Sequence, residues 1–407
     1  QGIDDNYYFA PAAQPYHEVI TPWQREFQQR IGKNHAKYFD ANGWLYFTKE
    51  VFDLFYPSYG DTYPIYNGAI GMTFEQAGLG RAGLGIITRD GDTLTLLDRV
   101  THHFTTSLST IETASANAVN LVREFRKYFN EAVSTGVGEY KTYVIKNKPE
   151  DRQRISALLD LLDKNGIGYE YAGNTAKGTG GYNYDNGKEQ PFTVENGDIL
   201  VQSQQPRSVL VKVLFEPKSK LVDSATYDIT AWSLPYVYGI TAYASRTKIQ
   251  LTPSAKPSPI TNTLSPAYGY VIRWQGVQSA RALSQLLNKG VKVRYAEKPF
   301  ELNGQNFKEG SLIIIKKSNE GIWAQVPSLL TAAGNDNNIM VETIQTGFVD
   351  QGYDFGSDKI HLIHIPNIAM LTGEGTSSND AGEVWHFFDQ VLRYPITLIN
   401  VNDFTRI

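Results

Sequence analysis

The chain has 407 residues, of which 41% are hydrophobic and 20% charged, a composition typical of a soluble globular protein with two or three domains. Its net charge of −4, without any dense Lys/Arg block, argues against nucleic-acid and anionic-membrane partners, and its longest apolar runs are too short to cross a bilayer. The absence of cysteine excludes disulfides, zinc–thiolate sites and a cysteine nucleophile.

The first predicted element is an amphipathic helix over residues 20–39. Thr21 and Gln24 have the spacing of a capping box, and Pro22 suits the first helical position. We expect the helix to end before Gly43.

A loop rich in Gly, Tyr and Pro follows over residues 56–68. The apolar residues 69–74 then predict a short buried strand that ends at Glu75. Residues 96–129 predict a long helix that closes the first domain, because apolar residues recur there with a period near 3.6. These residues are Leu108, Ile111, Ala114, Ala118, Leu121, Val122 and Phe125.

A weak internal repeat begins after residue 137. Each copy has a strand, a helix, a second strand, an acidic-Gly turn and a third apolar strand. Strand–helix–strand order predicts parallel pairing with right-handed crossovers, and therefore an open α/β sheet. A Pro-rich segment, 251–266, is expected to link two lobes. The matching pieces are 143–145 and 270–272, 157–166 and 282–290, 171–172 and 295–296, and 195–201 and 309–315.

The stretch from residue 56 to residue 78 carries the main functional signal. Thr73-Phe74-Glu75 resembles the strand of zinc metallocarboxypeptidases that ends in the catalytic glutamate. Asp61 lies fourteen residues before Glu75, the interval at which that family places an acidic residue in its substrate-pocket loop. The whole stretch resembles a signature of large bacterial members of the family.

This resemblance implies a role for each matching residue. Glu75 would be the general base and later the general acid in peptide hydrolysis, and a strand end would hold it rigidly. Thr73 and Asp61 would line the pocket for the C-terminal substrate residue. Purely structural roles are the alternatives: a solvated strand end for Glu75, a turn for Asp61, and packing for the tyrosines. The family's mobile tyrosine has three candidates in the preceding loop, which are Tyr56, Tyr59 and Tyr63.

The sequence departs from the family at the zinc ligands. None of the seven histidines begins a His-x-x-Glu motif, and residues 6–11 resemble the segment that follows the family's third ligand. We therefore expect that ligand just before Gln1 and the motif about a hundred residues upstream in a longer parent protein. Zinc is expected in the parent but not in this chain, which by itself would be inactive and would need the missing N-terminal half of the peptidase domain as a partner.

Two histidine pairs offer weaker metal candidates. His102 and His103 are neighbours on a predicted helix and point about 100° apart, so they cannot easily share one metal. His361 and His364 are expected on opposite faces of a short strand. Structural roles are favoured for all four.

Residues 359–370 predict an apolar strand, which a Gly-Glu-Gly turn connects to a helix through Val391. This region resembles the class I glutamine amidotransferase-like domains of large bacterial carboxypeptidases, but the missing cysteine excludes glutaminase activity. The turn is too short to indicate a nucleotide site. In the aromatic segment 226–235, Asp228 and Trp232 are candidates for an interdomain or substrate-facing role, with loop packing as the alternative.

The sequence thus predicts an α/β protein in two regions. Residues 1–136 would form the later half of a carboxypeptidase-type mixed sheet with flanking helices. Residues 137–407 would form an amidotransferase-like α/β region, with two lobes split near 251–266. The expected function is zinc-dependent release of C-terminal residues from peptides by a secreted or periplasmic parent whose signal peptide is not in this chain. The alternative is a non-catalytic binding or scaffold module.

Overall fold

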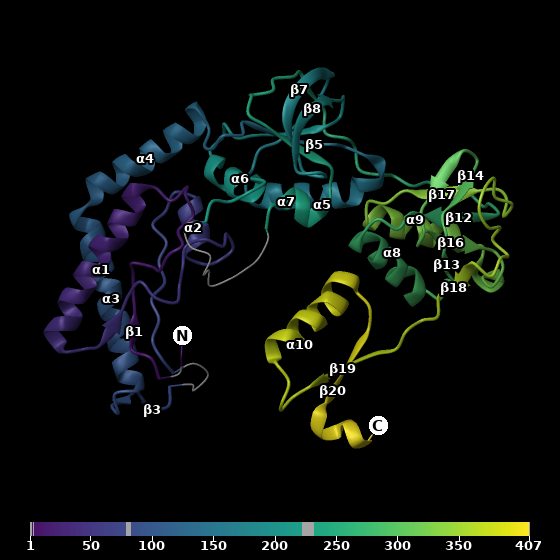
Figure 1. Cartoon of the computed structure of the whole chain (residues 1–407). Helices are drawn as coiled ribbons and strands as arrows, with labels where there is room; N and C mark the ends of the chain where they lie inside the picture. The colour runs from purple at the N-terminus through teal and green to yellow at the C-terminus, as the bar shows by residue number, and fades with distance from the viewer. Residues whose placement is uncertain (1, 3, 79–82, 222–231, 407) are drawn as a thin grey trace. The chain divides into compact units, whose positions relative to one another are not determined.

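A computed structural model describes residues 2, 4–78, 83–221 and 232–406 (Figure 1). The chain has the mixed α/β fold expected from its sequence. It divides into two compact units, one of residues 1–147 and 158–256 and the other of residues 148–157 and 257–407. Among the described residues, no helix is both long and apolar enough to span a bilayer.

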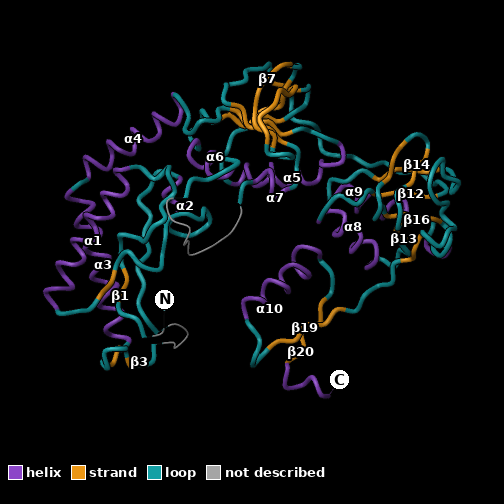
Figure 2. Tube along the Cα trace, in the orientation of Figure 1, coloured by secondary structure: helices purple, strands orange, loops and turns teal. Residues whose placement is uncertain are grey.

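Helices are the main regular elements of the N-terminal part of the first unit, and long loops connect them (Figure 2). Thr21 caps α1 through the predicted capping box, and Gly43 ends the helix in the left-handed conformation. The elements of this part are β1 (Tyr7–Tyr8), α1 (Pro22–Asn42), β2 (Tyr46–Phe47), α2 (Thr62–Tyr66), β3 (Ile86–Ile87), β4 (Thr93–Leu94), α3 (Leu96–Ala116) and α4 (Ala118–Ser134).

The long helix expected over residues 96–129 is divided into α3 and α4 at Asn117. The Asn117 side chain donates to the carbonyl of Thr113 at 2.8 Å, and its backbone leaves helical geometry. Thr95 begins α3 with a capping box to Asp98. Helix formation was therefore predicted correctly, whereas the break depends on one polar residue inside the apolar pattern.

The apolar side of α3 and α4 faces solvent. Ser109 on the buried side of α3 instead contacts α1, where His35 Nδ1 and Asn34 Nδ2 lie 2.8 Å from its hydroxyl. The exposed side chains, each at least half accessible, form what we call the apolar stripe: Leu97, Val100, Phe104, Leu108, Ile111, Val119, Val122 and Phe125. The 3.6-residue period thus marks an unburied face rather than a core face.

The rest of the first unit contains a seven-stranded sheet in the order β11-β6-β9-β5-β10-β7-β8. Val144 of the central strand packs against Phe192 from the β7–β8 hairpin and against Leu200. This part contains β5 (Thr142–Ile145), the end of α5 (Arg152–Lys164), β6 (Glu170–Ala172), β7 (Ala176–Asn183), β8 (Lys188–Val194), β9 (Ile199–Gln202), α6 (Ser208–Phe215), α7 (Leu234–Tyr238), β10 (Ala242–Ser245) and β11 (Pro253–Ser254). The start of α5 and the 3₁₀ turn at Pro149–Asp151 before it belong to the second unit.

The second unit repeats this order in a five-stranded sheet, β17-β12-β16-β13-β18. Helices α8 and α9 pack on one face, and Phe300 and Phe307 of the β14–β15 hairpin pack on the other. Its elements are β12 (Gly269–Ile272), α8 (Val277–Asn288), β13 (Arg294–Ala296), β14 (Phe300–Leu302), β15 (Gln305–Phe307), β16 (Leu312–Ile315), a 3₁₀ turn (Glu320–Ile322), α9 (Val326–Asp336), β17 (Val341–Ile344) and β18 (Ile360–Leu362).

The internal repeat is present, but the parallel pairing expected for it is wrong. The third strand of each copy, β9 or β16, lies between the first two and pairs antiparallel with both. The first and second strands therefore run in the same direction without bonding to each other. Each third strand is wholly apolar at its centre, so it gains most by entering the middle of the sheet.

The C-terminal segment forms a separate strand–helix–strand motif within the second unit. Its strands pair parallel over five residue pairs, and the single strand expected from residue 359 to residue 370 is interrupted after β18. The elements are β19 (Ile368–Thr372), α10 (Ser378–Trp385), a π-helical segment (His386–Leu392), β20 (Ile396–Asn400) and a terminal 3₁₀ segment (Val401–Arg406).

Candidate functional site

A cavity of about 480 Å³ gathers four of the residues selected from the sequence. We call it the Glu75 cavity. Tyr59, Asp61, Thr73 and Glu75 come from two stretches of the chain that the fold brings together. The complete lining is Phe52, Asp53, Tyr59, Gly60, Asp61, Met72, Thr73, Phe74 and Glu75.

Asp61 has a structural role in this cavity. Its Oδ1 accepts a hydrogen bond from the backbone N–H of Thr62 at 2.7 Å, which caps α2, and its Oδ2 accepts from Thr73 Oγ1 at 2.6 Å. The residue is buried, so these two charge-assisted bonds offset part of the cost of removing its carboxylate from water. Asp61 and Thr73 therefore act as one hydrogen-bonded pair.

The segment before Glu75 is not the strand expected from its apolar residues. Residues 69–74 form no regular strand, and the backbone of Glu75 pairs with that of Tyr8 in an isolated β-bridge, with N···O distances of 2.8 and 3.0 Å. Side chains of α1 replace a neighbouring strand: Gln24 donates to the carbonyl of Ala69 at 2.9 Å, and Gln28 donates to that of Gly71 at 2.8 Å.

Gly71 is required by the close approach of this segment to the preceding loop. A Cβ at this position would lie 1.8 Å from the backbone oxygen of Asp61. Because that neighbour is backbone, a side chain here would displace the segment that carries Thr73 and Glu75.

The three candidate tyrosines have different surroundings. Tyr59 lines the Glu75 cavity, and its ring lies 5.2 Å from the ring of Tyr56. Tyr56 in turn lies 5.7 Å from the indole of Trp232. Tyr63 does not line the cavity, and its hydroxyl donates to Asn165 Oδ1 at 2.9 Å. The geometry therefore favours Tyr59 as the tyrosine nearest the cavity.

Helix α3 places two histidines beside the residues around Glu75. His102 Nδ1 lies 2.6 Å from Gln76 Oε1, and His103 Nδ1 lies 2.8 Å from the hydroxyl of Tyr7. Burial lowers the pKa of both imidazoles, and the negative charge of Glu75 partly opposes this for His103. Both are consequently neutral at pH 7.

His361 lies elsewhere, on β18 of the second unit. Its Nε2 is 2.9 Å from a carboxylate oxygen of Glu297, and its ring stacks on Tyr295. His364 follows the strand rather than lying within it. The Gly373–Gly375 turn follows β19 as expected, with both glycines at positive φ.

The donors around Glu75 do not by themselves fit a zinc ion. Within the described ranges, no three His, Asp or Glu side chains lie close enough to hold one metal. Asp53, Asp61 and Glu75 share the cavity lining, but both oxygens of Asp61 accept hydrogen bonds from Thr62 and Thr73.

Asp53, a buried carboxylate in the cavity wall, was not predicted from the sequence. A signal was available, because Asp53 interrupts the apolar run 51–55, where a charge needs a partner or a function. Trp232, which was selected, lies against Tyr56. Asp228 falls outside the described residues.

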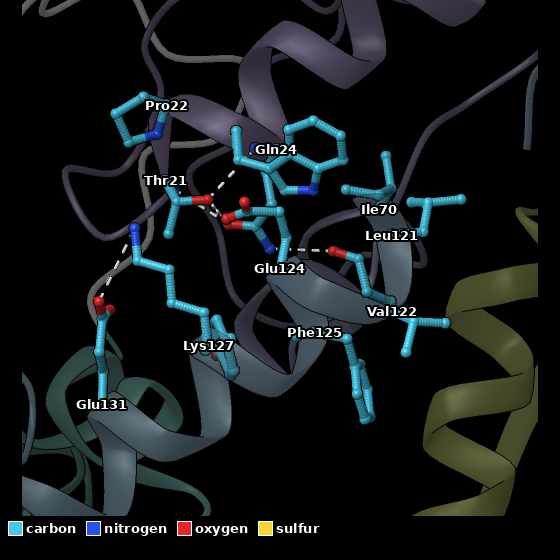
Figure 3. A pocket seen from close by; sticks show the side chains of 14 residues that line it. Thr21, Pro22, Gln24, Ile70, Leu121, Val122, Glu124, Phe125, Lys127 and Glu131 are labelled. Carbon is cyan, nitrogen blue, oxygen red and sulfur yellow. Dashed lines mark hydrogen bonds and ion pairs between the residues drawn. The ribbon is translucent and has the colours of Figure 1, made fainter. Parts of the chain in front are cut away.

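A second cavity of about 640 Å³ lies between the start of α1 and α4 (Figure 3). Trp23, Leu121, Val122 and Phe125 give it an apolar wall, so it continues the apolar stripe. Figure 3 shows Lys127 and Glu131 at its edge, where their charged groups are 3.9 Å apart.

Comparison of the chain with protein-family models, curated proteins and solved structures finds no match in any of the three.

Proposed function

We propose that this chain belongs to a zinc-dependent carboxypeptidase in which the Glu75 cavity receives the C-terminal residue of a peptide. The observation that carries the proposal is the shared cavity of Asp61, Thr73 and Glu75. The same three residues carry the sequence resemblance, and the fold brings them together although 69–74 is not a strand. The parent protein is proposed to be secreted or periplasmic.

The chain's own residues would divide the work at this site. Glu75 would take a proton from the attacking water and return it to the leaving amine. The Asp61–Thr73 pair would fix the pocket wall, because each side chain holds the other at 2.6 Å. Tyr59 would close over the bound residue. The metal donors are not supplied by the described residues, so activity is proposed for the longer parent and not for this chain alone.

The apolar stripe supports a companion for this chain. We propose that the N-terminal half of the peptidase domain covers it, because at least half of each of its eight side chains is exposed. Contiguous apolar surface of this kind marks a contact with another polypeptide segment.

The alternative function is a non-catalytic binding or scaffold module. One observation favours it: Asp61, the residue expected to contact substrate, has both carboxylate oxygens engaged within the protein. In that case the cavity would be a structural remnant, and the repeated α/β region would bind a partner.

Alanine release from penta-alanine by the full parent protein tests the proposal. Glu75→Gln is expected to lower kcat at least about 100-fold with little change in KM, because only proton transfer is lost. Glu26→Gln, on the exposed side of α1, is the matched control and should retain the parent rate. A Glu75→Gln enzyme as fast as the parent, or a parent that binds no zinc and releases no alanine, would favour the scaffold function.

A further inference from the structure

The loop that carries the candidate tyrosines is attached to a part of the chain far from it in sequence. We call residues 55–66 the tyrosine loop. Its internal bonds are local: the Tyr66 hydroxyl donates to the carbonyl of Phe55 at 2.7 Å, and the Tyr63 N–H donates to that of Tyr59 at 3.0 Å. Its aromatic rings extend these contacts beyond the loop.

Trp232 makes the first attachment. Its indole lies 5.0 Å from the ring of Phe55 and 5.7 Å from that of Tyr56, with edge-to-face geometry in both cases. Its Nε1–H donates to the carbonyl of Val213 in α6 at 2.9 Å. A continuous chain of contacts therefore runs from α6 through Trp232 and Tyr56 to Tyr59, which lines the Glu75 cavity.

A buried polar pair makes the second attachment. His17 Nε2 lies 2.8 Å from Glu216 Oε1, and the two side chains are 0% and 6% exposed. The backbone N–H of Val19 donates to His17 Nδ1, so Nε2 carries the proton and donates to Glu216. The imidazole also stacks on Phe55 at 5.5 Å. Phe55 thus contacts both His17 and Trp232.

Charges around α6 strengthen this second attachment. Lys212 pairs with Glu18 and lies 3.7 Å from Glu216 Oε2. The Ser219 hydroxyl donates to Glu216 Oε1 at 2.7 Å. Since a buried carboxylate is costly unless its oxygens are bonded, this full set of partners fixes where Glu216, and with it His17, can lie.

We infer that α6 and Trp232 position the tyrosine loop, and that Trp232 is a positioning residue for Tyr56 and Tyr59. The inference deepens the proposed function, on which it rests for the statement that Tyr59 closes over substrate. It gives the region after residue 137 a defined task at the candidate site: it holds the loop at the cavity mouth without itself contacting substrate.

Two substitutions at Trp232 separate its ring from its N–H. Trp232→Ala removes both the stacking and the bond to Val213, whereas Trp232→Phe keeps a ring against Phe55 and Tyr56. Trp274→Ala, in the second unit, removes a tryptophan that is 43% exposed and is the matched control.

Hydrogen–deuterium exchange of the tyrosine loop is the deciding measurement. We expect its amides to exchange roughly tenfold faster in Trp232→Ala, with near-normal rates in Trp232→Phe and Trp274→Ala. Protection of the central strands β5 and β9 should stay unchanged, which shows that the effect is local. Unchanged loop exchange in Trp232→Ala would overturn the inference.

A second variant keeps the inference testable if Trp232→Ala unfolds. If Trp232→Ala loses protection throughout the first unit, Glu216→Gln becomes the test, because it keeps a hydrogen-bond acceptor but removes the charge beside His17. In Glu216→Gln, faster exchange limited to the tyrosine loop would support the inference. Loop exchange at the same rate as in the unsubstituted protein would refute it.

Binding of penta-alanine with a free carboxylate, compared with its C-terminal amide, separates this inference from the proposed function. We expect Trp232→Ala to weaken binding of the free acid at least about tenfold and Trp232→Phe to restore it. If the unsubstituted protein binds neither peptide, the proposed function loses its support. The exchange rates still decide whether Trp232 positions the loop.

Discussion

At the residue scale, His35 is the most perturbed imidazole. It is fully buried, its ring lies edge-on to Phe9 and Phe74, and its Nδ1 is 2.8 Å from the hydroxyl of Ser109. Burial lowers its pKa from 6.5 to about 4, because charging the imidazole would require a cation beneath α3.

This shift predicts acid sensitivity in a defined window. Between pH 6.5 and about pH 4 the unfolded chain binds a proton at His35 that the folded chain does not, so stability falls as the pH falls. The contribution lost amounts to about 3 kcal/mol. Chemical denaturation at several pH values from 7 to 4 measures this effect. The free energy of unfolding should fall more steeply with pH in the unsubstituted chain than in His35→Gln. Equal slopes would contradict the prediction.

At the element scale, α3 and α4 are amphipathic helices whose apolar face is exposed instead of buried. The apolar stripe follows the helical period, yet the side chains packed on α1 are polar ones such as Ser109. A periodic pattern indicates that a face can be buried, but not by which segment. Among the described residues, the side chains of the apolar stripe stay at least half exposed.

A matched pair of phenylalanines tests this view. Phe125 on the apolar stripe is 56% exposed, whereas Phe39 on α1 is fully buried among Tyr7, Phe9 and Trp44. Phe39→Ala should lower the free energy of unfolding by about 3–5 kcal/mol and Phe125→Ala by less than about 1 kcal/mol. Urea denaturation of both variants measures the difference. A large loss from Phe125→Ala would mean that the stripe is covered within this chain.

At the scale of the whole molecule, each unit contains one copy of the repeated sheet. The copies share the neighbour order of five strands, with a helix after the first strand and another after the third. Val144 on β5 and Val271 on β12 hold equivalent central positions, and both are fully buried.

These equivalent valines predict two unfolding transitions. Val144→Ala and Val271→Ala should each cost about 1–3 kcal/mol, since each removes buried methyl groups from a packed sheet. Because the valines belong to different units, calorimetry should show each variant lowering the midpoint of a different transition. A single transition that both variants shift equally would show that the chain unfolds as one cooperative unit.

The sequence by itself determined the local features of the structure, which depend on residues close together in the chain. Local backbone and side-chain geometry determines the capping box at Thr21 and the left-handed conformation of Gly43, and a short stretch of sequence is enough to predict such features. The same holds for the order of elements in the repeat. Four residues of the Glu75 cavity could also be selected, because the resemblance covers a single stretch. Asp53 was missed although its position in an apolar run was a signal.

The tertiary structure alone decided the contacts between distant segments. It placed β9 and β16 in the middle of their sheets, replaced a strand at 69–74 by hydrogen bonds from Gln24 and Gln28, and turned the apolar stripe outward. It also set Trp232 against Tyr56. The physical reason is that such contacts depend on which of several apolar and polar surfaces pack together, a free-energy difference that no local pattern contains.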